Sequence, residues 1–255
     1  MSDVRASWEE RAAHYGDGLT GVLFRGLSMH ANEAIDEWHS WIVREVFAKE
    51  IPSNGQVLDL GCGYGRLSVA MLQRRRDVVV TGVDVSLKYC EMYGNSVGAA
   101  VCADMVSLPF RDASFDGVVA VTSLMYAAPE ERPMVLRELA RITKPMSTVL
   151  LLDPGLEMQR LVGFLRGRRS VSPTGGHGFG QDEYIELARS GGFSVKAVGG
   201  NCFLSQFLLM PGVGGSERSF IKHALRRIVR LDCQEGGYSA SALHRWILAR
   251  RGDAM

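Results

Sequence analysis

The sequence predicts an α/β fold, a Rossmann-like doubly wound sheet of seven mostly parallel strands with an antiparallel last strand. N-terminal and C-terminal helical additions flank it. Strands that alternate with helices predict a parallel sheet covered on both faces, and near-continuous apolar runs fit strands buried on both sides. Such runs occur at 56–61, 77–83, 99–103, 115–121 and 147–153. Helical patterns lie between them at about 65–75, 86–96 and 130–142.

Two helices are expected before the first strand. Residues 3–15 have helical spacing, with Trp8, Ala12 and Tyr15 on one side. A second helix is expected over 28–49, because apolar residues recur there at intervals of three and four. Its apolar stripe comprises Ile35, Trp38, Ile42, Val46 and Phe47.

After the fifth strand the chain changes character. A helix is expected at 181–192, and strands at 193–199 and 202–210 are expected to complete the sheet. Residues 216–251 show two basic amphipathic patterns, which predict a pair of helices with eight arginine or lysine residues against three acidic ones. Such a pair packs on the domain with its arginines in solvent, or contacts an anionic substrate, a membrane surface or a second subunit in a homodimer.

Composition favours a globular protein without a strongly charged partner. The 255 residues are 46% hydrophobic and 22% charged, with a formal net charge of +1, which gives no electrostatic case for nucleic acid. No apolar run is long enough to cross a membrane, and the N-terminus resembles neither a signal nor a transit peptide. The five cysteines are scattered without metal-like spacing. We therefore expect a cytoplasmic protein with reduced thiols and no metal site.

The stretch VLDLGCGYG, residues 57–65, indicates a ligand site. A buried strand ends there and turns into a helix, with glycine at Gly61, Gly63 and Gly65, and ligands bind at the carboxyl ends of such strands. A dinucleotide fingerprint would need glycine where Arg66 stands, and the P-loop pattern is absent. The carboxylate of Asp59 would repel a phosphate and suits a ligand with an ammonium group. S-adenosylmethionine has such a group and no phosphate.

These residues resemble motif I of the class I S-adenosylmethionine-dependent methyltransferases. Further segments of that family follow in order over roughly residues 52–155, and the closest likeness is to small-molecule methyltransferases such as those of ubiquinone and menaquinone biosynthesis. The segments are VVVTGVD ending at Asp84, CADMVSLPF (102–110), SFDGVVAVTSLMYAAPEE (114–131) and LRELARITKPMSTVLLLDP (136–154). The resemblance implies a helical lid or cap at 1–50 and a cofactor-binding methyltransferase domain at 51–211. The family's fold normally stops there, and the basic amphipathic patterns predict a basic helical extension at 212–255.

The resemblance also assigns cofactor contacts. Asp59 lies near the methionine ammonium, the backbones of Gly61 and Gly63 approach the methionine and ribose portions, and Asp84 accepts from both ribose hydroxyls, a bidentate match. Asp104 and Met105 are expected to contact the adenine. Tyr15, at the end of the first helix, is expected to cover the cofactor. The alternative is that Asp84 and Asp104 only cap the elements that follow them, and that the first helix only packs on the domain edge.

Catalytic residues are less evident, because the reactivity belongs to the cofactor and the protein supplies alignment. Tyr126 stands after the fourth strand, where the family often has histidine, and is expected to line the acceptor pocket or to bond the acceptor. His177 lies between glycines in the loop 171–180, and a histidine there suits a general base. A plain surface histidine is the alternative, and three histidines in the N-terminal part compete with it: His14, His30 and His39.

The sequence therefore predicts methyl transfer from S-adenosylmethionine to a hydroxyl or amine of a small metabolite, such as a sugar, a lipid precursor or a natural-product intermediate. A non-catalytic scaffold that binds S-adenosylmethionine is the rival. An RNA or protein methyltransferase is a third option, which VTSLMY (121–126) disfavours, because D/N-P-P-Y/F stands there in many enzymes that methylate nucleic-acid amino groups.

Overall fold

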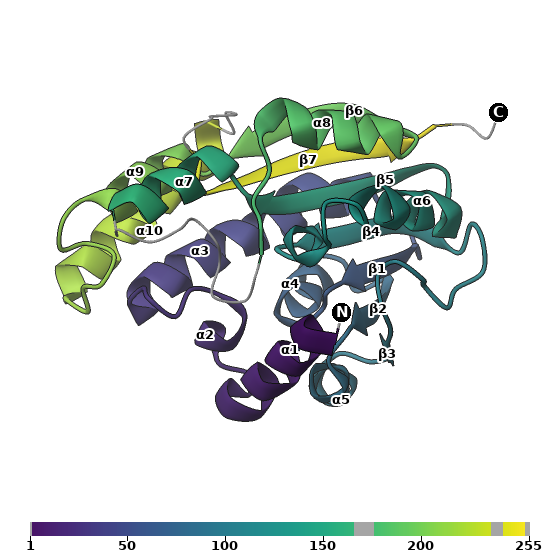
Figure 1. Cartoon of the computed structure of the whole chain (residues 1–255), viewed down its shortest axis with the longest axis horizontal. Coiled ribbons are helices and arrows are strands. Elements are labelled where there is room, and N and C mark those ends of the chain that lie inside the picture. The colour runs from purple at the N-terminus through teal and green to yellow at the C-terminus, as the bar shows by residue number, and fades with distance from the viewer. Residues whose placement is uncertain (1, 166–175, 236–241, 253–255) are drawn as a thin grey trace.

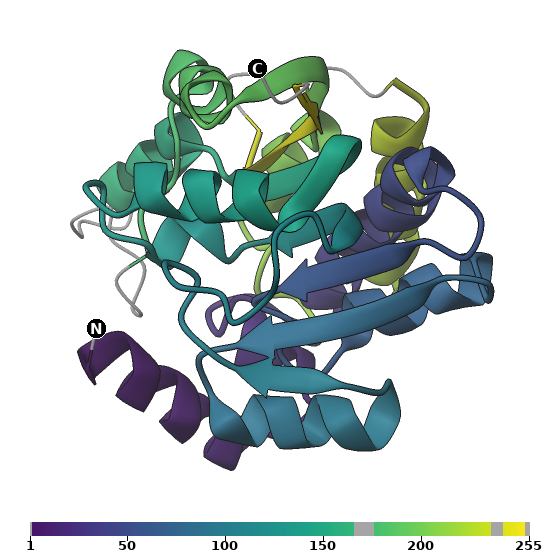
Figure 2. The same ribbon diagram turned by 90° about the vertical axis from the view of Figure 1, so that its right-hand side faces the viewer.

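The computed structural model describes residues 2–165, 176–235 and 242–252. Helices cover both sides of one sheet (Figures 1 and 2). The strands are β1 (Gln56–Leu60), β2 (Val79–Asp84), β3 (Ala100–Cys102), β4 (Phe115–Val121), β5 (Thr143–Pro154), β6 (Phe193–Gly200) and β7 (His244–Arg251). The α-helices are α1 (Ser2–Tyr15), α2 (Leu19–Val22), α3 (Met29–Trp41), α4 (Arg66–Arg74), α5 (Leu87–Ser96), α6 (Arg132–Ile142), α7 (Leu156–Leu165), α8 (Gln181–Ser190), α9 (Cys202–Leu209) and α10 (Ser219–Glu235).

The sheet has the order β3-β2-β1-β4-β5-β7-β6. The first five strands pair in parallel, and β7 runs antiparallel to both of its neighbours, β5 and β6. The predicted seven-stranded, mostly parallel, doubly wound sheet is confirmed. The strand order reverses at β1 and β4, and the carboxyl ends of these strands are where a ligand is expected in an open α/β sheet.

The structure corrects two elements of the C-terminal part. Residues 202–209 form the helix α9, not a strand, because an apolar run of this length fits either element and its first turn is capped by Asp232. The carboxylate of Asp232 accepts hydrogen bonds from the backbone N–H groups of Phe203 and Leu204, at 2.9 and 2.8 Å. Residues 244–251 form β7, not a helix, so the segment 212–255 completes the sheet and the predicted division at residue 211 cuts across it.

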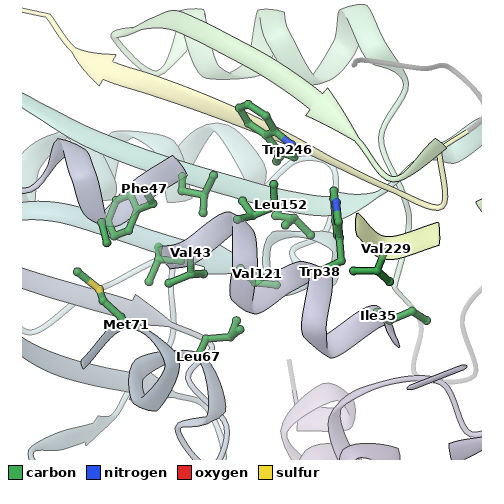
Figure 3. Packing of buried hydrophobic residues seen from close by; sticks show 14 of the residues in the cluster. Ile35, Trp38, Val43, Phe47, Leu67, Met71, Val121, Leu152, Val229 and Trp246 are labelled. Atoms are coloured by element: carbon green, nitrogen blue, oxygen red, sulfur yellow. The ribbon is translucent and has the colours of Figure 1, made fainter. Parts of the chain in front are cut away.

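Side chains alternate between two hydrophobic clusters, one on each face of the sheet. On one face α3, α4 and α10 pack against β1, β4, β5 and β7, and Figure 3 shows Trp38, Phe47 and Trp246 spread across this cluster. On the other face α6 and α8 cover alternate residues of the same strands. After α3, residues Ile42–Phe47 form a π-helical turn η1 and Ala48–Glu50 a 3-10 turn η2. The second predicted helix therefore covers the sheet and is no lid.

The first helix, by contrast, lies over the carboxyl ends of the strands. Figure 2 shows α1 beside α5 at the β3 edge. The Glu9 carboxylate accepts a hydrogen bond from the Leu87 N–H at the start of α5. The Arg11 guanidinium donates to the carbonyls of Thr20 and Leu23, each at 3.2 Å, which fixes α1 to the α2 segment. Among the described residues, no helix is long and apolar enough to cross a bilayer.

Candidate active site

The turn between β1 and α4 depends on its three glycines. Gly61, Gly63 and Gly65 have φ values of +73°, +53° and +95°, where residues with a side chain are strained. A Cβ on Gly61 would lie 2.5 Å from the Cβ of Ser123, and one on Gly65 would lie 2.5 Å from Val97. Glycine is therefore required at these two positions by packing inside the protein, before any ligand is considered.

A cavity of about 500 Å³ opens at this turn. Its volume suits a nucleoside-sized ligand, since small-molecule sites occupy about 300–1,000 Å³. Val4 and Trp8 of α1 line it on the lid side, and Tyr15 is not among the described residues of its wall. Tyr15 instead packs against His14, with ring centroids 4.5 Å apart. The other sequence-predicted site residues all line the cavity: Asp59, Gly61, Gly63, Asp84, Asp104, Met105, Tyr126 and His177.

Asp84, the last residue of β2, is held by backbone donors. Its Oδ2 accepts the Gly63 N–H and its Oδ1 the Ser86 N–H, both at 2.9 Å. Asp84 is 9% exposed, and burial raises the pKa of its carboxyl to about 6. Asp84 thus ties β2 to the glycine turn, and because each carboxylate oxygen has two acceptor positions, it keeps capacity for ligand hydroxyls.

Asp59, near the end of β1, is the second buried acid of the cavity. Its Oδ2 accepts a hydrogen bond from the Ser68 hydroxyl at 2.6 Å, and Ser68 in turn contacts the Tyr93 hydroxyl at 2.9 Å. Burial raises the pKa of Asp59 to about 6, while the Ser68 hydrogen bond and the Arg66 charge act in the opposite direction. A cation bound nearby would offset the free-energy cost of burying this charged carboxylate.

The third acid lies at the far end of the cavity. Asp104 follows β3, and its Oδ1 accepts the Val106 N–H at 3.1 Å, while Met105 between them lines the wall. The lining thus has acids at the turn and at the β3 end, with apolar walls between. This spacing suits an elongated ligand that has a polar group at each end.

Two buried hydroxyls in the cavity wall have no hydrogen-bond partner within the described protein. They are Ser123 Oγ, after β4, and Tyr89 Oη, on α5. Both side chains are nearly inaccessible, at 5% and 1% exposure. A buried polar group without a partner is costly, so these hydroxyls point to a ligand with hydrogen-bonding groups. The sequence analysis did not select either, because their position depends on how separate elements meet.

Tyr126 and His177 both line the cavity. The Tyr126 ring packs edge-on against Trp8, with centroids 5.1 Å apart. The His177 N–H donates to the Met125 carbonyl at 2.9 Å, and Arg132 Nη2 donates to the His177 carbonyl at 3.2 Å. This end of the loop is thus held by its backbone, with the imidazole exposed at the cavity. The first part of the predicted loop, residues 171–175, lies outside the described residues.

The competing histidines lie elsewhere. His14 packs on Tyr15, and His30 lies between Glu33 and Glu217. His39 is fully buried and contacts His244, with His39 Nε2 3.3 Å from His244 Nδ1. None of the three lines the cavity described above. Among the described residues, no group of three His, Cys, Asp or Glu side chains is arranged to hold a metal ion.

Comparison with known proteins identifies the family. A family model described as "Methyltransferase domain" matches residues 57–146. The chain is 31% identical over 163 residues to "O-methyltransferase resE" of Aspergillus sclerotiorum, covering 60% of this chain and 61% of that protein. It is 33% identical over 163 residues to "O-methyltransferase rstn1" of Aspergillus nomiae, covering 60% of this chain and 71% of that protein. The chain belongs to the class I S-adenosylmethionine-dependent methyltransferases.

Solved structures agree on the fold. The magnesium protoporphyrin IX methyltransferase of Synechocystis, solved with bound S-adenosylhomocysteine, superimposes with a TM-score of 0.64 at 16% identity, covering 98% of this chain and 99% of that one. The chain spans about 60% of the length of the first curated relatives, at 61%, 58% and 60%. The cofactor of the family is S-adenosylmethionine, and the acids and unpartnered hydroxyls of the cavity fit its ammonium, ribose and adenine groups.

Proposed function

We propose that this chain transfers the methyl group of S-adenosylmethionine to a hydroxyl of a small-molecule acceptor. The observation that carries this proposal is the single cavity that contains the glycine turn, Asp59 and Asp84 together with Tyr126 and His177. One side of it offers groups that suit the cofactor, and the other offers an aromatic wall with an imidazole. Two substrates that must react directly require such a shared space.

The proposed roles follow from the chemistry of each group. When bound, S-adenosylmethionine supplies an electrophilic methyl group on its sulfonium. Asp59 balances the ammonium group, Asp84 holds the ribose hydroxyls, and Asp104 with Met105 holds the adenine. Trp8 replaces Tyr15 as the proposed cover, because it lines the cavity and Tyr15 does not.

On the acceptor side, His177 is the proposed general base or orienting group. A hydroxyl is a weak nucleophile, so a base that takes its proton speeds the transfer by about 10²–10⁴. The backbone contacts of His177 with Met125 and Arg132 place its imidazole beside the cavity. Tyr126 and Trp8 form an apolar aromatic wall against which an acceptor ring or chain packs.

The relatives favour oxygen over nitrogen as the acceptor atom. The proteins resE, cnsE and rstn1 are all named O-methyltransferases. The rival, a scaffold without activity, would not require an accessible imidazole beside the cofactor space. The contacts predicted for the basic C-terminal segment, with a membrane surface or a second copy, stay predictions. Its helix α10 presents exposed Arg226, Arg227 and Arg230.

The test is methyl transfer from trideuteromethyl-labelled S-adenosylmethionine to a panel of hydroxyl and amine metabolites, read by mass spectrometry. We expect a mass gain on a hydroxyl compound. His177→Ala is expected to lower turnover at least a hundredfold if His177 is the base, and several-fold if it only orients the acceptor. Cofactor affinity is expected to stay within about twofold.

The matched control is His223→Ala, since His223 is an exposed histidine on α10 whose ring lies 2.8 Å from the Ser219 carbonyl and which does not line the described cavity. It is expected to leave turnover unchanged. Cofactor binding without label transfer to any hydroxyl compound would favour the scaffold. Transfer to amines alone would refute the choice of oxygen.

A further inference from the structure

Four polar side chains form a chain of contacts that runs from the core to the cavity. Arg66, the first residue of α4, forms an ion pair with Asp36 of α3 through Nη1. Its Nη2 lies 3.2 Å from His39 Nδ1, and His39 Nε2 lies 3.3 Å from His244 Nδ1. His39 and His244 are 0% and 1% exposed. This series of contacts thus joins α3, α4 and the first residue of β7.

The direction of these hydrogen bonds is fixed by chemistry. Arginine only donates, so His39 Nδ1 must be an unprotonated acceptor and His39 Nε2 must carry the hydrogen. That hydrogen points to His244 Nδ1, which is therefore also an acceptor. Both imidazoles are neutral in this arrangement. Burial lowers the pKa of both rings, that of His39 well below its ordinary value and that of His244 to about 3, and the Arg66 charge adds to both shifts.

Arg66, within this series of contacts, faces the cofactor space. Arg66 lines the cavity, and it is the only arginine or lysine among the described lining residues, beside five acids. Those acids are Asp59, Asp84, Asp104, Glu130 and Glu131. Arg66 follows directly on the glycine turn, after Gly65, and lines the same cavity as Asp59, so it lies at the end of the cavity assigned to the methionine part. Its charge partly offsets the burial that raises the pKa of Asp59. Asp36 and His39 each accept one N–H of Arg66, and within the described residues no further hydrogen bond is recorded for its other three N–H groups.

The methionine part of the cofactor carries one negative group, its α-carboxylate. In a cavity lined by acids, this carboxylate needs a cationic partner, and arginine offers paired donors that match it. We propose that Arg66 receives this carboxylate, and that Asp36, His39 and His244 are positioning residues that hold the guanidinium at the cavity wall. The proposal rests on the proposed function, since it assumes that the cavity binds the cofactor.

A purely structural role makes a different prediction. If these four side chains only brace α3, α4 and β7, loss of Arg66 would weaken the binding of every ligand of the cavity alike. If Arg66 receives the carboxylate, its loss affects only ligands that carry one. The comparison of S-adenosylmethionine with decarboxylated S-adenosylmethionine, which differs by this group alone, separates the two roles.

The experiment is isothermal calorimetry of the full chain with both compounds. Wild type is expected to bind S-adenosylmethionine at least tenfold more tightly than the decarboxylated compound. Arg66→Met, which keeps the aliphatic stem, is expected to lose at least tenfold in affinity for S-adenosylmethionine and to change less than about twofold for the decarboxylated compound. Equal losses for both compounds, or no loss, would overturn the proposal.

The matched control is Arg75→Met. Arg75 also braces a helix against neighbouring segments, through bonds to the carbonyls of Ala48, Ile51 and Pro52, and it does not line the described cavity. Its loss is expected to lower thermal stability and to leave the preference for the carboxylate intact. If Arg75→Met removes that preference as Arg66→Met does, the effect is structural and the assignment of Arg66 fails.

The positioning residues are tested by rescue. His39→Leu removes both contacts and is expected to lose several-fold of the carboxylate preference, whereas His39→Gln, which has an acceptor and a donor, is expected to recover part of it. A preference unchanged in a folded His39→Leu variant would refute the positioning role. If that variant does not fold, the Arg66 variant decides. Absence of S-adenosylmethionine binding in wild type would instead refute the proposed function.

Discussion

Gly61 offers the sharpest prediction on the cofactor turn, because the structure separates two costs of a side chain there. The first is backbone strain, since Gly61 has φ +73°, and an L-residue in that region costs about 1–2 kcal/mol. The second is overlap. A Cβ would lie 2.5 Å from the Cβ of Ser123, and relieving such overpacking costs about 1–3 kcal/mol. Gly61→Ala is therefore expected to destabilise the fold by about 2–5 kcal/mol.

Gly212→Ala isolates the first cost. Gly212 has nearly the same backbone angle, φ +77°, and a Cβ there would meet nothing within 4 Å. Its loss of stability is expected to stay at about 1–2 kcal/mol. Urea unfolding of both variants measures the difference, and in a chain of this size about 1 kcal/mol corresponds to a shift in Tm of about 2–4 °C.

The same pair of variants tests the site. Ser123 lines the cavity, so its displacement by Ala at position 61 is expected to weaken S-adenosylmethionine binding at least tenfold, measured by calorimetry below the unfolding temperature. Gly212→Ala is expected to bind normally. Equal destabilisation of the two variants would refute the packing argument. Normal cofactor binding by a folded Gly61→Ala variant would refute the link between Ser123 and the cofactor.

Two further predictions concern side chains that line the cavity, and a third concerns Asp153, a buried acid near the end of β5. Asp84→Asn is expected to lose at least tenfold in cofactor affinity, since bonds to a charged group contribute about 1.5–3 kcal/mol. Asp232 is a buried acid outside the cavity that likewise accepts from two backbone N–H groups, and Asp232→Asn is expected to lose stability only. Equal affinities of wild type and Asp84→Asn in calorimetry would contradict the role of Asp84. Asp153 accepts from the Met125 N–H and the Tyr184 hydroxyl, and burial raises the pKa of its carboxyl to about 7, so the stability it contributes is present at low pH and is lost as pH rises through about 7. Relative to Asp153→Asn, wild type is expected to lose stability between about pH 4 and 8 by up to about 1.4 kcal/mol per unit of pKa shift, and parallel urea-unfolding profiles would contradict this. Trp8→Ala is expected to speed cofactor release several-fold in stopped-flow measurements, because it removes the cover of the cavity, whereas the half-buried Trp41 of α3 does not line the cavity and Trp41→Ala is expected to leave release unchanged.

The first half of the sheet was predictable because local signals determine it. The run before Asp59, the glycines after it and the run ending at Asp84 each fit one element only, and their order gives the parallel sheet and the place of its ligand. Asp59, Asp84 and Asp104 could be named for the same reason, since each lies at or just after the end of a predicted strand. Residues that reach the cavity from other elements, Ser123 and Tyr89, gave no such signal.

The sequence predicted which helix lies over the cavity, but not which residue of that helix lines it. Helical spacing placed Trp8 and Tyr15 on one side of α1, and the resemblance favoured Tyr15. Which of the two covers the cavity depends on how far along α5 the helix lies, and that is set by tertiary contacts. Glu9 at the start of α5 and Arg11 on the carbonyls of Thr20 and Leu23 fix this position, so that Trp8 faces the cavity.

The C-terminal strand shows that a basic sequence can still form a buried strand when its buried charges are paired. The basic amphipathic pattern of HRWILARR predicts a helix with its arginines in solvent. In β7 Arg245 is 1% exposed and is paired with Glu157 of α7, and the strand has partners on both edges. Its first residue, His244, meets His39 and through it Arg66 at the cavity. Two helices and the C-terminal strand thus converge on one guanidinium, so the place of β7 in the sheet bears on the position of Arg66 through direct contacts.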